Sequence, residues 1–160
     1  MKPSKRPKAV EQPSVSHVSD KGLRQFVGYN MKRAFNAVHS DLVTTLLPFE
    51  LRMVTYTALV LIKDNPGLRQ SQLADALAVE RPNLVMLIDE LERRELITRT
   101  PVLTDRRANA LQITLAGRRL CDKATDALHV HEEKLLASVD PDARKAMLQT
   151  LYQIETGKTE

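Results

Sequence analysis

Residues 65–99, NPGLRQSQLADALAVERPNLVMLIDELERRELITR, decide the fold because they place two short amphipathic helices directly one after the other. Apolar residues recur at helical spacing around 71–78 and again over 81–94. The preceding DNPG (64–67) is a strong turn signal, and Pro82 suits the first turn of the second helix. The apolar stripe of that helix consists of Leu84, Leu87, Ile88 and Leu91.

The period of the pattern changes after this helix pair. Residues 96–102 and 109–115 read as two short strands, and the segment containing Asp105, Arg106 and Arg107 joins them. In the second strand Leu111, Ile113 and Leu115 alternate with polar residues, as in a strand with one buried face. Two short helices followed by a β-hairpin predict a winged helix-turn-helix, whose second helix enters the major groove of DNA.

The rest of the chain is predicted to be helical, so the fold class is mainly α. A long helix is expected over 23–47, capped by Ser19 or Asp20 and ended by Pro48. Residues 49–63 are apolar almost all round, which indicates a helix buried on most sides. A further helix begins at Ala116-Gly117, and Asp140-Pro141 starts the last one.

Composition fits this class and sets limits on function. Of the 160 residues 42% are hydrophobic, but only 4% are aromatic and none is Trp, so the core must be aliphatic. A net charge of +4 and a pI of about 9.3 permit nucleic-acid binding without demonstrating it. The lone Cys121 excludes an intrachain disulfide and fits a reducing cytoplasm.

The N-terminal residues 1–20 are interpreted as a disordered basic tail. They lack the apolar middle of a signal peptide, and no apolar run in the chain is long enough to span a membrane. A cytoplasmic location is therefore expected. A solvated leader is favoured for the tail over an arm that adds phosphate contacts.

Candidate DNA-binding residues lie at the starts of the two short helices. Asn83 could pair with adenine, Val85 and Met86 could touch thymine methyl groups, and Arg81 could reach a phosphate or a guanine. Packing against a neighbouring element is the alternative for Val85 and Met86, and a solvated helix start is the alternative for Arg81 and Asn83. Gln70 and Ser71 join these candidates. Asp89 and Glu90 are poor partners for DNA, so contact should fade toward the middle of the second helix.

Residues 65–99, followed by DRRANALQITLAG (105–117), resemble the MarR family of transcription regulators. The family's Asp-x-Arg wing signature maps to Asp105 and Arg107, and Thr114 and Gly117 also match. The resemblance covers roughly 22–157 and is most specific over 66–117. The departures are Ala78 and Glu95, where the family often has glycine in turns, and Val102 and Leu103, where its wing is usually polar.

The resemblance implies a homodimer that binds double-stranded DNA at a palindromic operator, with repression as the usual mode. It implies a DNA-binding domain at 48–117 and a helical dimerisation region formed by 21–47 and 118–160. It also favours Arg107 as the residue that enters the minor groove, where arginine suits the negative potential of a narrow groove. Asp105 would orient Arg107, and Arg106 would contact a phosphate.

The resemblance further implies a pocket for a small-molecule effector, often an aromatic anion. Arg52 and Tyr56 are spaced i, i+4 and are expected to share a face that suits an aromatic carboxylate, with apolar core as the alternative for Tyr56. The phrase ERPNLVMLIDELE is similar to a subgroup tied to degradation of aromatic acids such as hydroxycinnamates, in which some members respond to the CoA thioester. The effector-binding candidates are Arg24, Tyr29, Asn30, Arg33, His39, Arg52 and Tyr56, with Lys32 a further basic residue for the phosphates of CoA.

Four other functions compete with this one. A metal sensor would use HVHEE (129–133), where only His129 and Glu133 share a helix face, too few for a zinc site. A redox sensor would use Cys121, which is expected to be an inert buried thiol. We find no phosphate loop, HExxH or GxSxG, so neither an enzyme nor a cofactor is expected. A protein-interaction module would have no use for an arginine-tipped hairpin.

Overall fold

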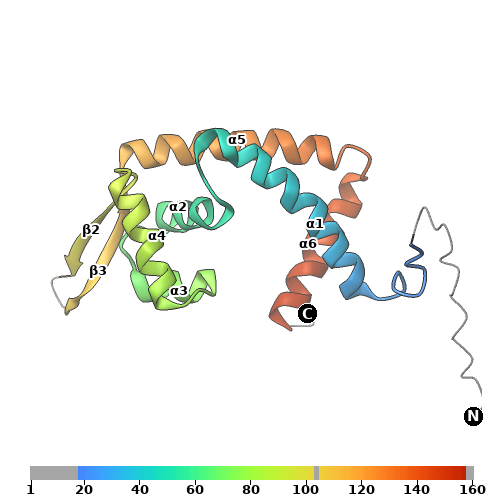
Figure 1. Cartoon of the computed structure of the whole chain (residues 1–160), viewed down its shortest axis with the longest axis horizontal. Coiled ribbons are helices and arrows are strands. Elements are labelled where there is room, and N and C mark those ends of the chain that lie inside the picture. Colours follow the sequence, from blue (N-terminus) through green and yellow to red (C-terminus); the bar gives the residue numbers. More distant parts are fainter. Residues whose placement is uncertain (1–17, 103–104, 158–160) are drawn as a thin grey trace, which may run out of the picture. The chain divides into compact units, whose positions relative to one another are not determined.

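The computed structural model describes residues 18–102 and 105–157; for residue 102 and for residues 105–108 it describes the backbone alone. It is mainly helical with a small antiparallel sheet, so the predicted winged helix-turn-helix class is confirmed (Figure 1). The elements are α1 (Val27–Leu46), a 3₁₀ turn η1 (Leu47–Phe49), α2 (Met53–Asp64), β1 (Leu68–Arg69), α3 (Gln70–Leu77), α4 (Arg81–Arg93), β2 (Ile97–Val102), β3 (Asp105–Ile113), α5 (Leu115–Leu135) and α6 (Pro141–Thr156).

A single aliphatic core joins α2, α3, α4, the sheet and the start of α5. The predicted stripe of α4 is confirmed, because all four of its members are at most 5% exposed. Burial of this apolar surface is the main force that holds the two short helices against the rest of the unit. The largest buried side chains are Leu46, Leu59, Ile62, Leu73, Ile88, Leu91, Ile97, Leu111, Thr55 and Cys121.

The sheet has three strands in the order β1–β3–β2, all antiparallel. The sequence did not predict β1, which pairs Leu68 with Leu111. The prediction that Asp105, Arg106 and Arg107 lie in the segment joining the two strands is wrong. Strand β3 begins at Asp105, so the backbone of Asp105–Arg107 belongs to the strand. Leu115 is also not a buried strand residue; it is the first residue of α5 and is 64% exposed.

Two turns take up the geometry that glycine favours although they carry other residues. Ala78 ends α3 at φ 51°, and Glu95 follows α4 at φ 57°. In each turn an amide bonds back to a carbonyl five residues earlier, from Val79 to Ala74 at 3.1 Å and from Leu96 to Leu91 at 3.0 Å. These are the bonds that close a helix C-terminus, so the departures from the family pattern leave both turns intact.

Helix ends differ from the predictions mainly at the N-terminal side. The first long helix begins at Val27, and Pro48 lies inside η1. The second begins only at Met53, because residues 47–49 form η1 and the amide of Arg52 is capped by the hydroxyl of Thr55. The predicted start at Asp140-Pro141 is confirmed, since Asp140 Oδ1 accepts hydrogen bonds from the amides of Asp142 and Ala143.

The chain divides into two compact units, Met1–Asn36 and Ala37–Glu160. Within the described ranges, no single helix is long and apolar enough to cross a membrane, and only the pair Val27–Phe49 and Met53–Asp64, bent by 72°, meets that criterion together.

Candidate nucleic-acid interface and pocket

The first two turns of α4 present the predicted DNA-binding residues to solvent. Arg81 and Asn83 are exposed, and Val85 and Met86 are 46% and 65% exposed. Packing of Val85 and Met86 into the fold, the alternative considered for them, is therefore not found in this chain. At the start of α3, Ser71 is exposed and Gln70 is half-buried. The exposed groups combine donors with apolar surface, which is what reading base edges in a major groove requires.

The acidic residues farther along α4 are held by arginines from other elements. Arg99 of β2 forms ion pairs with Asp89 and with Glu92, the second at 3.0 Å from Nε. Arg52, just before α2, forms an ion pair with Glu90. Each pairing offsets a negative charge beside the face that would meet phosphates, and each ties α4 to a neighbouring element. The sequence identified the acidic residues as unfavourable for DNA but not their partners.

The junction between the wing and α5 is fixed by Thr114. Its hydroxyl donates to the carbonyl of Glu95 at 2.7 Å and accepts from the amide of Gly117 at 2.9 Å. Thr114 is thus both the N-cap of α5 and a link to the turn after α4. The wing candidates Asp105, Arg106 and Arg107 have side chains outside the described residues, so their roles stay predictions.

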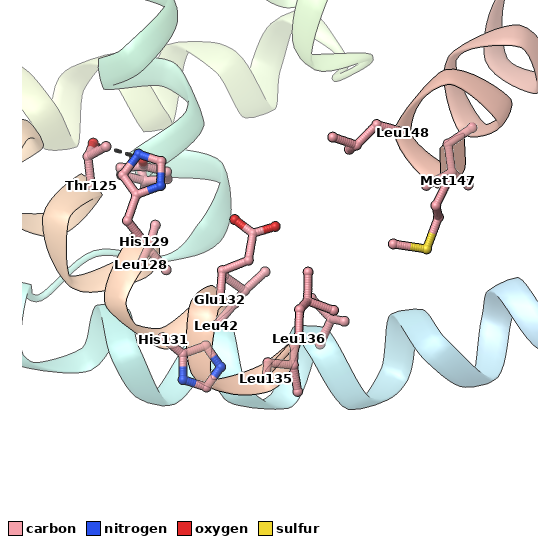
Figure 2. A pocket seen from close by; sticks show the side chains of 13 residues that line it. Leu42, Thr125, Leu128, His129, His131, Glu132, Leu135, Leu136, Met147 and Leu148 are labelled. Atoms are coloured by element: carbon pink, nitrogen blue, oxygen red, sulfur yellow. Dashed lines mark hydrogen bonds between the residues drawn. The ribbon is translucent and has the colours of Figure 1, made fainter. Parts of the chain in front are cut away.

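A pocket of about 400 Å³ opens beside α5 in the second unit. Figure 2 shows Glu132 of α5 and Leu136, which directly follows α5, facing the same space as Met147 and Leu148 of α6. The wall is mostly apolar, with a few polar groups, as in many sites for small organic molecules. The lining residues are Val38, Leu42, Tyr56, Thr125, Leu128, His129, His131, Glu132, Leu135, Leu136, Met147, Leu148 and Leu151.

The effector candidates of the second unit are not brought together. Tyr56 lines the pocket, and its hydroxyl shares a 2.9 Å hydrogen bond with Thr125 Oγ1. Arg52 does not share that face: its guanidinium turns to Glu90 of α4. His39 is half-buried and is not among the lining residues. Core packing, the alternative for Tyr56, also holds in part, because the ring packs against the buried cluster.

The contribution of α5 to the pocket was not predicted from the sequence. Thr125, Leu128, Glu132 and Leu135 recur at i, i+3, i+7 and i+10, which places them on one helix face. His129 and Glu132, which belong to the HVHEE segment considered for metal binding, also line the pocket.

The effector candidates of the first unit lie in the first turns of α1 and in the segment just before it, where they form a local polar cluster. The carboxylate of Asp20 accepts hydrogen bonds from Tyr29 Oη and from Arg24 Nε, both at 2.8 Å. The Asn30 amide donates to the carbonyls of Arg24 and Phe26, and Arg33 is exposed. The hydrogen bond from Tyr29 lowers the pKa of Asp20 and raises the pKa of Tyr29. The expected cap at Asp20 is thus replaced by side-chain contacts.

The side chains considered for a metal sensor do not form a cluster, and the thiol considered for a redox sensor is buried. Across the side chains that the structure describes, no three His, Cys, Asp or Glu come together in a way that could hold a metal ion. His131 Nε2 lies 3.6 Å from the carboxylate of Asp41. Cys121 is fully buried, and burial raises the pKa of its thiol, which disfavours the reactive thiolate.

Comparison with known proteins places this fold and helix pair in a family. A model of the MarR family matches residues 51–108. A structure of the transcriptional repressor CouR bound to a 23-mer DNA duplex is 33% identical, with a TM-score of 0.83, over 88% of this chain and 99% of that chain. CouR bound to p-coumaroyl-CoA is 31% identical, with a TM-score of 0.76, over 87% and 98%. A protein of Thauera aromatica assigned as transcriptional regulator of the hcr operon is 28% identical over 129 residues, 80% of this chain and 78% of that protein. The chain therefore belongs to the MarR family of transcription regulators.

Proposed function

We propose that this regulator is a repressor that binds a palindromic operator as a homodimer and releases it when an aromatic acyl-CoA binds. Operator binding is supported by the exposed start of α4, where Arg81, Asn83, Val85 and Met86 face solvent. The carboxylates of Asp89 and Glu90, farther along the helix, are paired with arginines. The similar CouR structure with bound DNA supports the same use of this fold. Arg107 would enter the minor groove, with Asp105 orienting it and Arg106 on a phosphate.

The homodimer is supported by apolar side chains that the single chain leaves exposed. Burying such surface against a second copy is favourable, and a row of this kind on a helix marks an interface. We propose 48–117 as the DNA-binding domain and 21–47 with 118–160 as the dimerisation region. The exposed apolar residues of α1 and the segment before it are Leu23, Phe26, Val27, Met31, Phe35 and Val43; those of α6 are Met147, Leu148, Leu151, Tyr152 and Ile154.

The effector is proposed from the pocket beside α5. Its volume and apolar wall suit an aromatic acyl group, and the Tyr56–Thr125 pair and His129 offer polar contacts. CouR, 31% identical, has been solved with p-coumaroyl-CoA, and the Thauera protein is assigned to the hcr operon. A hydroxycinnamoyl-CoA is therefore the first ligand to test, with the free aromatic carboxylate as the second.

Three measurements test the proposed function. Footprinting on DNA upstream of the regulator's own gene should protect two half-sites about one helical turn apart, roughly 34–36 Å. Affinity for that DNA should fall steeply as salt rises, since phosphate contacts release counterions. Calorimetry with p-coumaroyl-CoA, feruloyl-CoA and the two free acids should show binding of at least one. DNA binding that does not depend on salt would refute the proposed operator contacts. Failure of every one of the four ligands to bind would refute the proposed effector.

A further inference from the structure

Arg52 occupies the junction between two elements that serve different parts of the proposed function. It precedes α2 with an extended backbone (φ −90°, ψ 160°), and its guanidinium is paired with Glu90 on α4. The side chain of Arg52 is 66% exposed and that of Glu90 26%, so the pair lies at the surface beside the exposed start of α4. With Glu90, Asn83 and Met86, Arg52 lines a recess of about 250 Å³.

The backbone of Arg52 is fixed to the first turn of α2 by three hydrogen bonds. Its amide donates to Thr55 Oγ1 at 2.8 Å, and its carbonyl accepts from that hydroxyl at 2.8 Å and from the amide of Tyr56 at 2.9 Å. Thr55 is fully buried. Movement of this turn therefore moves the backbone of Arg52 and changes the position from which its guanidinium reaches Glu90.

The same turn forms part of the pocket wall. Tyr56 lines the pocket and shares its hydroxyl hydrogen bond with Thr125 of α5. Two hydrogen bonds and an ion pair thus connect Thr125, Tyr56, Arg52 and Glu90 of α4 in that order. A ligand that competes for the hydroxyls of Tyr56 and Thr125 acts on the first bond of this series.

We infer that Arg52 is a positioning residue: it sets α4 through Glu90 and transmits occupation of the pocket to that helix. This inference rests on the proposed function, since it requires both operator binding and an effector in the α5 pocket. The ligand's effect on DNA affinity is then a coupling between two sites, and Arg52 with Glu90 carries part of it.

Two simpler roles for Arg52 make opposite predictions. If Arg52 only attracted phosphates, Glu90→Gln would free that cation, remove a negative charge near DNA and tighten operator binding. If Arg52 contacted the effector, Arg52→Met would weaken effector binding and Glu90→Gln would not. As a positioning residue, Arg52 needs Glu90, so both substitutions weaken operator binding and neither changes effector affinity.

The experiment measures operator affinity by fluorescence anisotropy, with and without saturating p-coumaroyl-CoA, and effector affinity by calorimetry. It compares Arg52→Met, Glu90→Gln, the double variant and the charge swap Arg52→Glu/Glu90→Arg. We expect each single substitution to weaken operator binding about fivefold. This is the change in Kd that follows if the stabilisation by one strong exposed ion pair is lost. The double variant should be no weaker than either single one, because both remove the same pair.

The decisive readout is the operator Kd measured with the effector divided by the operator Kd measured without it. This ratio should fall by about threefold or more in both single variants and recover in the charge swap, while effector affinity stays within about twofold of wild type. Glu155→Gln on α6 and Arg119→Met on α5 are matched controls at exposed positions, and both should leave the ratio unchanged. Circular dichroism melting of each variant checks that it is folded.

Three outcomes would overturn the inference: tighter operator binding in Glu90→Gln, loss of effector affinity in Arg52→Met alone, or an unchanged ratio in both single variants. Failure of the proposed function is distinguishable, because wild-type protein would then fail to bind the operator or to respond to the effector. If another of the four ligands proves active, that ligand takes the place of p-coumaroyl-CoA in every arm.

Discussion

The carbonyl oxygen of Leu96 lies where a side chain on Gly117 would begin: a Cβ on Gly117 would stand 2.0 Å from that oxygen. Gly117→Ala must therefore push α5 away from the turn after α4, because the obstacle is backbone. Overpacking of this kind costs about 1–3 kcal/mol, so we expect a clear fall in Tm by circular dichroism. The same shift should strain the Thr114 cap and weaken operator binding.

Gly28 offers the matched control, since it lies in α1 and a Cβ there meets nothing within 4 Å. Gly28→Ala should leave Tm unchanged or raise it slightly, because alanine is the better helix former. Equal melting of Gly117→Ala and wild-type protein would show that the close approach at Leu96 is not a constraint.

Ala78→Gly should stabilise the protein. Ala78 ends α3 at φ 51° and ψ 41°, a conformation that costs a non-glycine residue about 1–2 kcal/mol. Glycine relieves that cost but loses about 0.5–1 kcal/mol in chain entropy, so the mid-range net gain is about 0.7 kcal/mol. Urea denaturation measures it. Ala76→Gly, inside the same helix, should destabilise by about 1 kcal/mol; stabilisation there as well would refute the reasoning.

Arg107→Ala should weaken operator binding strongly while leaving the fold and oligomeric state unchanged. This expectation comes from the family's wing signature, in which Arg107 enters the minor groove. Asp105→Ala should weaken binding nearly as much, although simple electrostatics would have loss of a negative charge strengthen it. Anisotropy with operator DNA measures both, and size-exclusion chromatography monitors the assembly. Tighter binding by Asp105→Ala would remove the orienting role from Asp105.

Cys121 should resist modification in the folded protein. It is fully buried, and burial raises the pKa of its thiol, so little thiolate is available to react. A thiol reagent such as dithionitrobenzoate should label it only after denaturation, and hydrogen peroxide should leave operator affinity unchanged. Rapid labelling under native conditions would return the redox alternative to consideration.

The same thiol predicts a pH dependence of stability. Because the folded-state pKa of Cys121 is raised, the unfolded chain loses its proton first as pH rises above about 8.5. The free energy of unfolding should then decrease with rising pH until the folded-state pKa is reached. Urea titrations at several pH values measure the slope, which Cys121→Ala should flatten. An identical slope in both proteins would contradict the assignment.

Periodicity predicted the helix faces well, because burial of an apolar stripe is what selects them. The four stripe residues of α4 were named from spacing alone, and all are buried. The two-residue strand β1 was missed because Leu68 and Arg69 are too short a segment to show a period. The start of α2 at Met53 was misplaced because its cap is Thr55, which lies inside the apolar run and accepts from the amide of Arg52, and because no Ser, Thr, Asp or Asn stands at the N-cap to mark it.

The candidate site was predicted less completely, for a reason that Arg52 makes plain. The i, i+4 rule that grouped Arg52 with Tyr56 holds inside a helix, but Arg52 precedes α2 and has an extended backbone. Its side chain therefore leaves in another direction, toward Glu90, a partner far away in sequence that no local spacing could reveal. The exposed start of α4 was predictable, since it is the face opposite the stripe.

The pocket wall also supplies its own optical signal. The chain has no Trp and three Tyr, of which Tyr152 is exposed on α6 and Tyr29 lies in the first unit. Only Tyr56 stands in the pocket wall, with its hydroxyl held by Thr125. When the protein is excited at a wavelength that tyrosine absorbs and phenylalanine does not, its emission therefore comes from tyrosine alone. An aromatic molecule that settles against Tyr56 should quench part of that emission, so occupancy can be followed without a dye and without DNA.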